Sequence, residues 1–155
     1  MGRDLDADKA NVGQNVIVVG AGLTGIETAV NCASQGKTVT VIEMMGPEIV
    51  LAEAPSGHKY YLLDRLKEYG VRIVTNAKME EVTEKGIRVI GGDLEWTEYE
   101  ADNVVLAMGM RPREEKVAEL RRLIPETEVY VVGDCLKPRS LFAANHDGFN
   151  AACEL

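Results

Sequence analysis

The sequence predicts an α/β fold, in which helices flank a parallel β-sheet that also carries a three-stranded antiparallel β-meander. Three observations lead to this prediction. Apolar β-branched runs alternate with segments of helical periodicity in the first half of the chain. Short strands with hairpin signals follow at 77–100, and a further apolar run then returns to the parallel sheet. A polar leader is expected at residues 1–14.

The first predicted unit is a strand, a helix and a second strand. The run 15–19 is continuous and β-branched, which is typical of a central parallel strand buried on both faces. Helical spacing of apolar residues extends from Leu23 to about Gln35, and Gly36 caps the helix. The segment 38–43 is the second strand. We expect a right-handed crossover between the two strands.

The next elements complete a β, α, β, α, β order. Gly and Pro residues make 44–55 a loop, and a helix is expected over 56–69. Ser56 is its expected N-cap and Gly70 its stop. The third strand is expected at 71–75.

The second half of the chain begins with the meander. Its strands are expected at 78–83, 86–90 and 94–99, because Glu-Lys and Gly-Gly-Asp separators between them are hairpin signals. The elements that follow are a strand returning to the parallel sheet at 103–107, a helix at 114–123, a short strand at 129–132 and a last helix at 140–155.

Composition excludes several classes of function. The formal net charge is -8 and the pI is about 4.8, which argues against nucleic acid as a partner. No apolar run approaches the roughly 20 residues that span a bilayer, and no signal peptide is recognised. The three cysteines form no CxxC pair and no metal-ligand pattern. We expect a cytoplasmic protein without a bound metal.

One motif carries chemistry. Residues 20–25 read GAGLTG and match GxGxxG, directly after the first strand and at the start of the first helix. In this pattern Gly20 permits the turn, Gly22 admits a pyrophosphate and Gly25 lets the helix pack closely on the sheet. The helix N-terminus then attracts the pyrophosphate. The loop residues that contribute to this Rossmann-type site are Gly20, Ala21, Gly22, Leu23, Thr24 and Gly25.

An acidic residue completes the dinucleotide fingerprint. Glu43 ends the second strand about 20 residues beyond the glycines, where a carboxylate accepts hydrogen bonds from the adenosine ribose. Met44 and the residues after it include no nearby Lys or Arg for a 2′-phosphate, so the sequence favours NAD(H) over NADP(H). The alternative is a plain strand-to-helix turn with Glu43 solvated. Glu27 is either an exposed helix carboxylate or a polar group facing the cofactor.

The order of motifs resembles the pyridine-nucleotide-disulfide oxidoreductase superfamily. The segments that carry this resemblance are GAGLTGIETA, VTVIE, VVLAMGMRP and VYVVGDCLKPRSLFAANHDGFNAA. The last segment looks like the C-terminal portion of NADH:flavin oxidoreductases related to 2-enoate reductase and 2,4-dienoyl-CoA reductase. In that family a TIM barrel holds FMN and an iron-sulfur cluster, and an FAD domain carries an inserted NAD(P)H domain.

The resemblance implies a role for each segment. Residues 15–110 correspond to the NAD(H)-binding domain, with the meander at 77–100, and 111–155 correspond to the end of an FAD domain. Gly109 and Met110 lie beside the nucleotide in the family. Residues implied to contact FAD in the intact enzyme are Gly133 and Asp134. From the residues alone, that pair is equally an ordinary turn after a strand.

The resemblance also implies a fragment. The chain has one dinucleotide fingerprint where the family has two, and it lacks the barrel and the cluster cysteines. We therefore expect it to orient NADH for hydride transfer to FAD, with electrons passed on to an enoate or enoyl-CoA substrate. Its partners would be the missing FAD and barrel domains. The isolated chain would be inactive and able to form a homodimer through exposed apolar surface.

Two other functions share the same motif. One is a nonenzymatic NAD(H)-binding sensor or regulatory module that reports the NADH/NAD balance to a partner protein. The other is an FAD-binding site, since many GxGxxG loops hold FAD; a yellow purified protein would favour it.

Overall fold

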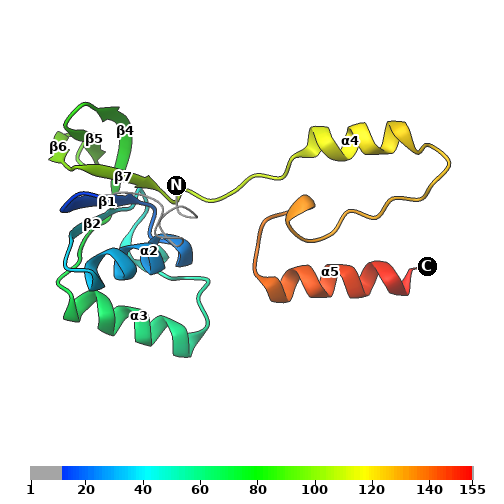
Figure 1. The fold of residues 1–155 in the computed structure, drawn as a ribbon, viewed down its shortest axis with the longest axis horizontal. Helices are drawn as coiled ribbons and strands as arrows, with labels where there is room; N and C mark the ends of the chain where they lie inside the picture. Colours follow the sequence, from blue (N-terminus) through cyan, green and yellow to red (C-terminus); the bar gives the residue numbers. More distant parts are fainter. Residues whose placement is uncertain (1–11, 155) are drawn as a thin grey trace. The chain divides into compact units, whose positions relative to one another are not determined.

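The computed structural model describes residues 12–154, and the chain divides into two compact units between Gly109 and Met110. Most of the expected polar leader, 1–14, lies outside the described residues. Figure 1 shows the elements of each unit.

The first unit is built on a four-stranded parallel sheet with strand order β3-β2-β1-β7. The first strand is interior in this sheet, as the sequence predicts. Its β-branched residues suit this position because both faces are covered. The strands are β1 (Asn15–Val19), β2 (Thr38–Ile42), β3 (Arg72–Val74) and β7 (Asn103–Leu106), and the helices are α2 (Leu23–Ser34) and α3 (Ser56–Glu68).

Different elements pack on the two faces of this sheet (Figure 1). Val16 and Val18 of β1 belong to a core that includes buried residues of α2 and α3. Ile17 and Val19 belong to a second core with Ile87 of the meander. Because successive side chains of β1 point to opposite faces of the sheet, this one strand packs against the helices on one face and against the meander on the other.

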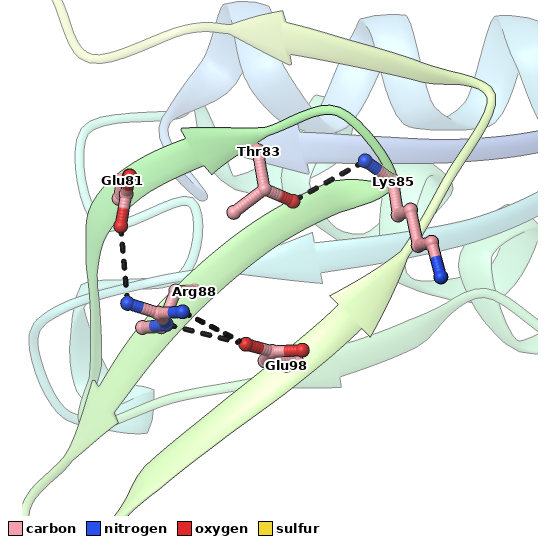
Figure 2. A network of polar contacts seen from close by, with 5 residues as sticks. All are labelled: Glu81, Thr83, Lys85, Arg88 and Glu98. Carbon is pink, nitrogen blue, oxygen red and sulfur yellow. Dashed lines mark hydrogen bonds and ion pairs between the residues drawn. The ribbon is translucent and has the colours of Figure 1, made fainter.

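The meander has the predicted antiparallel order β4-β5-β6, formed by β4 (Ala77–Thr83), β5 (Gly86–Gly91) and β6 (Trp96–Glu100). Away from its core, Arg88 contacts Glu81 at 3.2 Å and Glu98 at 3.1 Å (Figure 2). Beside them, the Lys85 N–H donates to the Thr83 hydroxyl at 3.3 Å. The charged groups are largely exposed, so each ion pair stabilises the fold by less than about 1 kcal/mol.

The second unit contains α4 (Glu114–Leu123), the 3-10 turn η2 (Gly133–Cys135) and α5 (Leu141–Cys153). The strand expected at 129–132 was a wrong prediction, because those residues form no strand in the structure. A strand needs a partner for its N–H and C=O groups, and the described part of this unit provides none.

The expected helix caps are partly corrected. The expected cap Ser56 is instead the first residue of α3; Pro55 precedes the helix, and no side chain caps it in the described residues. Ser140 caps α5 by accepting a hydrogen bond from the Ala143 N–H. Gly36 follows α2 with φ +80, the left-handed conformation that suits glycine.

Two glycines determine how β1, α2 and β7 meet. Gly20 has φ +108, and a Cβ there would stand 2.4 Å from the Ala107 carbonyl oxygen. A Cβ at Gly25 would stand 2.0 Å from the Gly20 carbonyl oxygen. Gly22 differs from both, since a Cβ added there would have no atom within 4 Å. Packing within the protein therefore requires glycine at positions 20 and 25 but not at position 22.

This contrast predicts different stabilities for two alanine variants. Gly25→Ala should lower the free energy of unfolding by about 3 kcal/mol or more, because backbone must move to admit the methyl group. Gly22→Ala is the matched control, with an expected loss below about 1 kcal/mol, since only the helix cap changes. Urea unfolding of both proteins measures the difference. Equal losses would contradict this account of the loop.

Candidate functional site

The candidate site lies where the carboxyl ends of three parallel strands meet. The Gly20 N–H donates to the Ile42 carbonyl at 2.8 Å, and the Ala107 N–H donates to the Val19 carbonyl at 2.8 Å. The first bond joins the residue after β1 to the last residue of β2, and the second joins the residue after β7 to the last residue of β1. In open α/β sheets this edge is where ligands bind.

The N-terminus of α2 opens onto this edge. Gly22 is the N-cap residue with φ -69, and the Ile26 N–H donates to its carbonyl at 3.0 Å. Within residues 12–154 no side chain caps this helix, and its first turn carries no acidic residue. The first-turn N–H groups therefore have no side-chain acceptor within the described residues, which is the arrangement that binds anions.

Glu43 is buried beside the loop, with 8 % of its surface exposed. Its Oε2 accepts a hydrogen bond from the Ala21 N–H at 2.8 Å, and its Oε1 accepts one from the Met45 N–H at 2.9 Å. The structure thus brings Glu43 to the glycine-rich loop, as its sequence spacing suggested. Each carboxylate oxygen keeps a second lone pair for a further donor.

Sequence reasoning missed Leu51, which contacts the same loop. It follows the 3-10 turn η1 (Pro47–Ile49), and its N–H donates to the Ala21 carbonyl at 3.1 Å. Its φ is +53 and its side chain is fully buried in the core. A left-handed leucine has no sequence signal, because the tertiary packing imposes it.

The other predicted nucleotide residues are less enclosed. Glu27 Oε1 lies 2.9 Å from His58 Nε2 of α3, a contact that the sequence did not suggest. Met44 is 63 % exposed directly after Glu43. Gly109, with φ +85, ends the first unit, and Met110 begins the second.

The predicted flavin residues lie in η2 of the second unit. Gly133 is buried, with φ +59, and its N–H donates to Asp147 Oδ2 at 3.1 Å. Arg139 of the same unit donates to that carboxylate oxygen as well. Asp134 is exposed and lines an open hollow of about 420 Å³ together with Arg111. Asp147 therefore holds the turn that presents Asp134.

Loss of this carboxylate should loosen the turn. In Asp147→Ala, hydrogen exchange at the Gly133 amide should accelerate roughly tenfold, because its acceptor is gone. Exchange at core amides of β1, in the other unit, should be unchanged and serves as the internal control. NMR-detected exchange measures both. Unchanged exchange at Gly133 would show that Asp147 does not hold this turn.

Comparisons with known proteins identify the family of this chain. The family model for pyridine nucleotide-disulphide oxidoreductases matches residues 3–148. Cinnamate reductase of Clostridium sporogenes is 29% identical over 151 residues, covering 96% of this chain and 22% of that protein. NADH oxidase of Thermoanaerobacter brockii is 27% identical over 144 residues, covering 92% of this chain and 21% of that protein.

A solved structure shows the same fold over nearly the whole chain. The complex of 2-naphthoyl-CoA reductase with 2-naphthoyl-CoA matches with a TM-score of 0.83 and 27% identity, covering 99% of this chain and 23% of that one. The chain thus spans about a fifth of the length of these relatives. No helix in the part that the structure describes is both long and apolar enough to cross a membrane. The resemblance predicted from the motifs is confirmed: this chain belongs to the pyridine nucleotide-disulphide oxidoreductase family.

Proposed function

We propose that this chain binds NADH at the carboxyl edge of the parallel sheet and orients it for hydride transfer to FAD within a larger flavin-dependent oxidoreductase. The observation that carries the proposal is the buried Glu43 carboxylate, fixed beside an uncapped helix N-terminus. The chain has both groups that a dinucleotide needs, a hydroxyl acceptor and an anion site.

The loop fits a pyrophosphate. A Cβ at Gly22 would meet no protein atom within 4 Å, so packing within the protein does not explain the glycine. Close approach of a ligand to the backbone does explain it. The N–H groups of the first turn of α2 would then donate to the phosphate oxygens.

Glu43 supports a preference for NADH. The ribose hydroxyls would donate to the remaining lone pairs of a carboxylate that two backbone N–H groups already hold. A 2′-phosphate at the same place would meet negative charge, and the residues that follow, MMGPEI at 44–49, include no cation to offset it.

The chemistry of hydride transfer belongs to the two cofactors. When bound, NADH would supply the hydride and FAD would accept it. The residues of this chain bind and orient, and none is assigned as an acid, a base or a nucleophile. Residues 15–110 would form the NAD(H) domain, while Gly133 and Asp134, within 111–155, would contact FAD.

The substrate of the intact enzyme would be an enoate or an enoyl-CoA type compound. Support comes from the relatives, since one is named a cinnamate reductase and the solved structure is a 2-naphthoyl-CoA reductase. The chain covers about a fifth of each of these proteins, so the reduction itself would take place in other domains.

The preference can be tested by calorimetric titration with NADH and NADPH, alongside a visible spectrum of the purified chain. We expect a colourless protein that binds NADH roughly 10- to 100-fold more tightly than NADPH, because Glu43 repels the 2′-phosphate. Met44→Arg should reduce the ratio of NADH affinity to NADPH affinity, because it places a cation next to Glu43. Met44 is exposed, so the variant should fold.

Tyr60→Arg is the matched control for the added charge. Tyr60 is 70 % exposed on α3, and an arginine there should leave the NADH/NADPH ratio unchanged. NADPH binding as tight as NADH binding would contradict the role of Glu43. A yellow protein that binds neither nucleotide would assign the loop to FAD.

A further inference from the structure

Both polar backbone groups of Ala21 are held by residues far from it in sequence. Its N–H donates to Glu43 Oε2 at 2.8 Å, and its carbonyl accepts the Leu51 N–H at 3.1 Å. Ala21 is itself fully buried. It stands between Gly20 and Gly22, so these two bonds fix the middle of the glycine-rich loop.

The carboxylate that holds Ala21 is also fixed in place. The backbone N–H of Glu43 donates to the Val74 carbonyl at 2.8 Å, and its carbonyl accepts the Ala77 N–H at 2.9 Å. Its second carboxylate oxygen accepts the Met45 N–H. The backbone of Glu43 is therefore anchored to β3 and to the start of the meander. Hydrogen bonds hold its side chain in place before any ligand binds.

We infer that Glu43 positions the pyrophosphate-binding loop in addition to accepting the ribose hydroxyls, so that one carboxylate couples the two recognition steps. The inference rests on the proposed function. Without the carboxylate, the Ala21 N–H would be buried and unpaired, and the loop would shift until the group found another acceptor. Such a shift would displace the N–H groups at Gly22 and beyond. Pyrophosphate affinity would then fall even for a ligand that Glu43 never touches.

The dinucleotide fingerprint assigns Glu43 to ribose binding only. Two ligands, one with and one without ribose hydroxyls, distinguish that role from positioning of the loop. The probes are ADP and 2′,3′-dideoxyadenosine diphosphate, which carries the same pyrophosphate and lacks both ribose hydroxyls. Each is titrated calorimetrically into the full chain and into Glu43→Gln. The amide keeps the size of the side chain, but in either orientation it removes the negative charge from the group that accepts the Ala21 N–H, and its NH₂ group must face the N–H of Ala21 or of Met45.

The coupling predicts that Glu43→Gln weakens both ligands. Affinity for the dideoxy compound should fall roughly tenfold, as expected for losing a hydrogen bond to a charged acceptor. Glu48→Gln is the matched control: this exposed carboxylate lies five residues further along, and its loss should change neither affinity. Thermal unfolding of each variant checks that it is folded. Should Glu43→Gln not fold, Glu43→Asp carries the same comparison, since its shorter side chain withdraws from Ala21.

The outcomes separate the inference from the function on which it rests. If the variant binds the dideoxy ligand within about twofold of the unaltered chain while losing affinity for ADP, Glu43 serves the ribose only and the inference is wrong. If the unaltered chain binds neither ADP nor NADH, the proposed function and the inference fail together. Parallel losses for both ligands, without a change in Glu48→Gln, support the coupling.

Discussion

The absence of a side chain at Gly25 allows α2 to lie against the Gly20 carbonyl, and the rest of the carboxyl edge depends on that contact. A methyl group there would stand 2.0 Å from the carbonyl oxygen. Because the helix starts so close to β1, its N-terminus opens at the level of Glu43, which directly follows β2. The carboxylate can then reach Ala21, and the loop, the helix and the acidic residue form one hydrogen-bonded unit. Close packing in the backbone thus creates the polar arrangement above it.

Local patterns in the sequence predicted most of this arrangement. The spacing of Gly20, Gly25 and Glu43 reports a turn, a packing contact and a strand end, all of which are read from nearby residues. The contact of Leu51 with Ala21 could not be predicted from the sequence, because it needs a leucine in the left-handed conformation, which only tertiary packing enforces. The strand expected at 129–132 failed for the converse reason. Its β-branched run is locally suitable, but a strand exists only where another strand supplies its partners.

The two units contribute differently to the proposed enzyme. The first has two cores and places its candidate site on regular elements, which favours a fixed geometry for a bound nucleotide. The second holds the turn η2 through Asp147, while Leu141 and Phe142 of α5 are largely exposed. That exposed apolar surface supports the proposal that the chain works within a larger enzyme, in which other parts would cover it. Orientation of NADH would then be a property of the first unit, and contact with FAD a property of the second.

A crystal structure of the chain with NADH would show whether the edge formed by the glycine-rich loop and Glu43 holds the nicotinamide dinucleotide. We expect the pyrophosphate within hydrogen-bonding distance of backbone N–H groups at 22–24, with the adenosine ribose on Glu43. Nucleotide bound elsewhere on the chain, or bound here without contact to Glu43, would contradict this expectation.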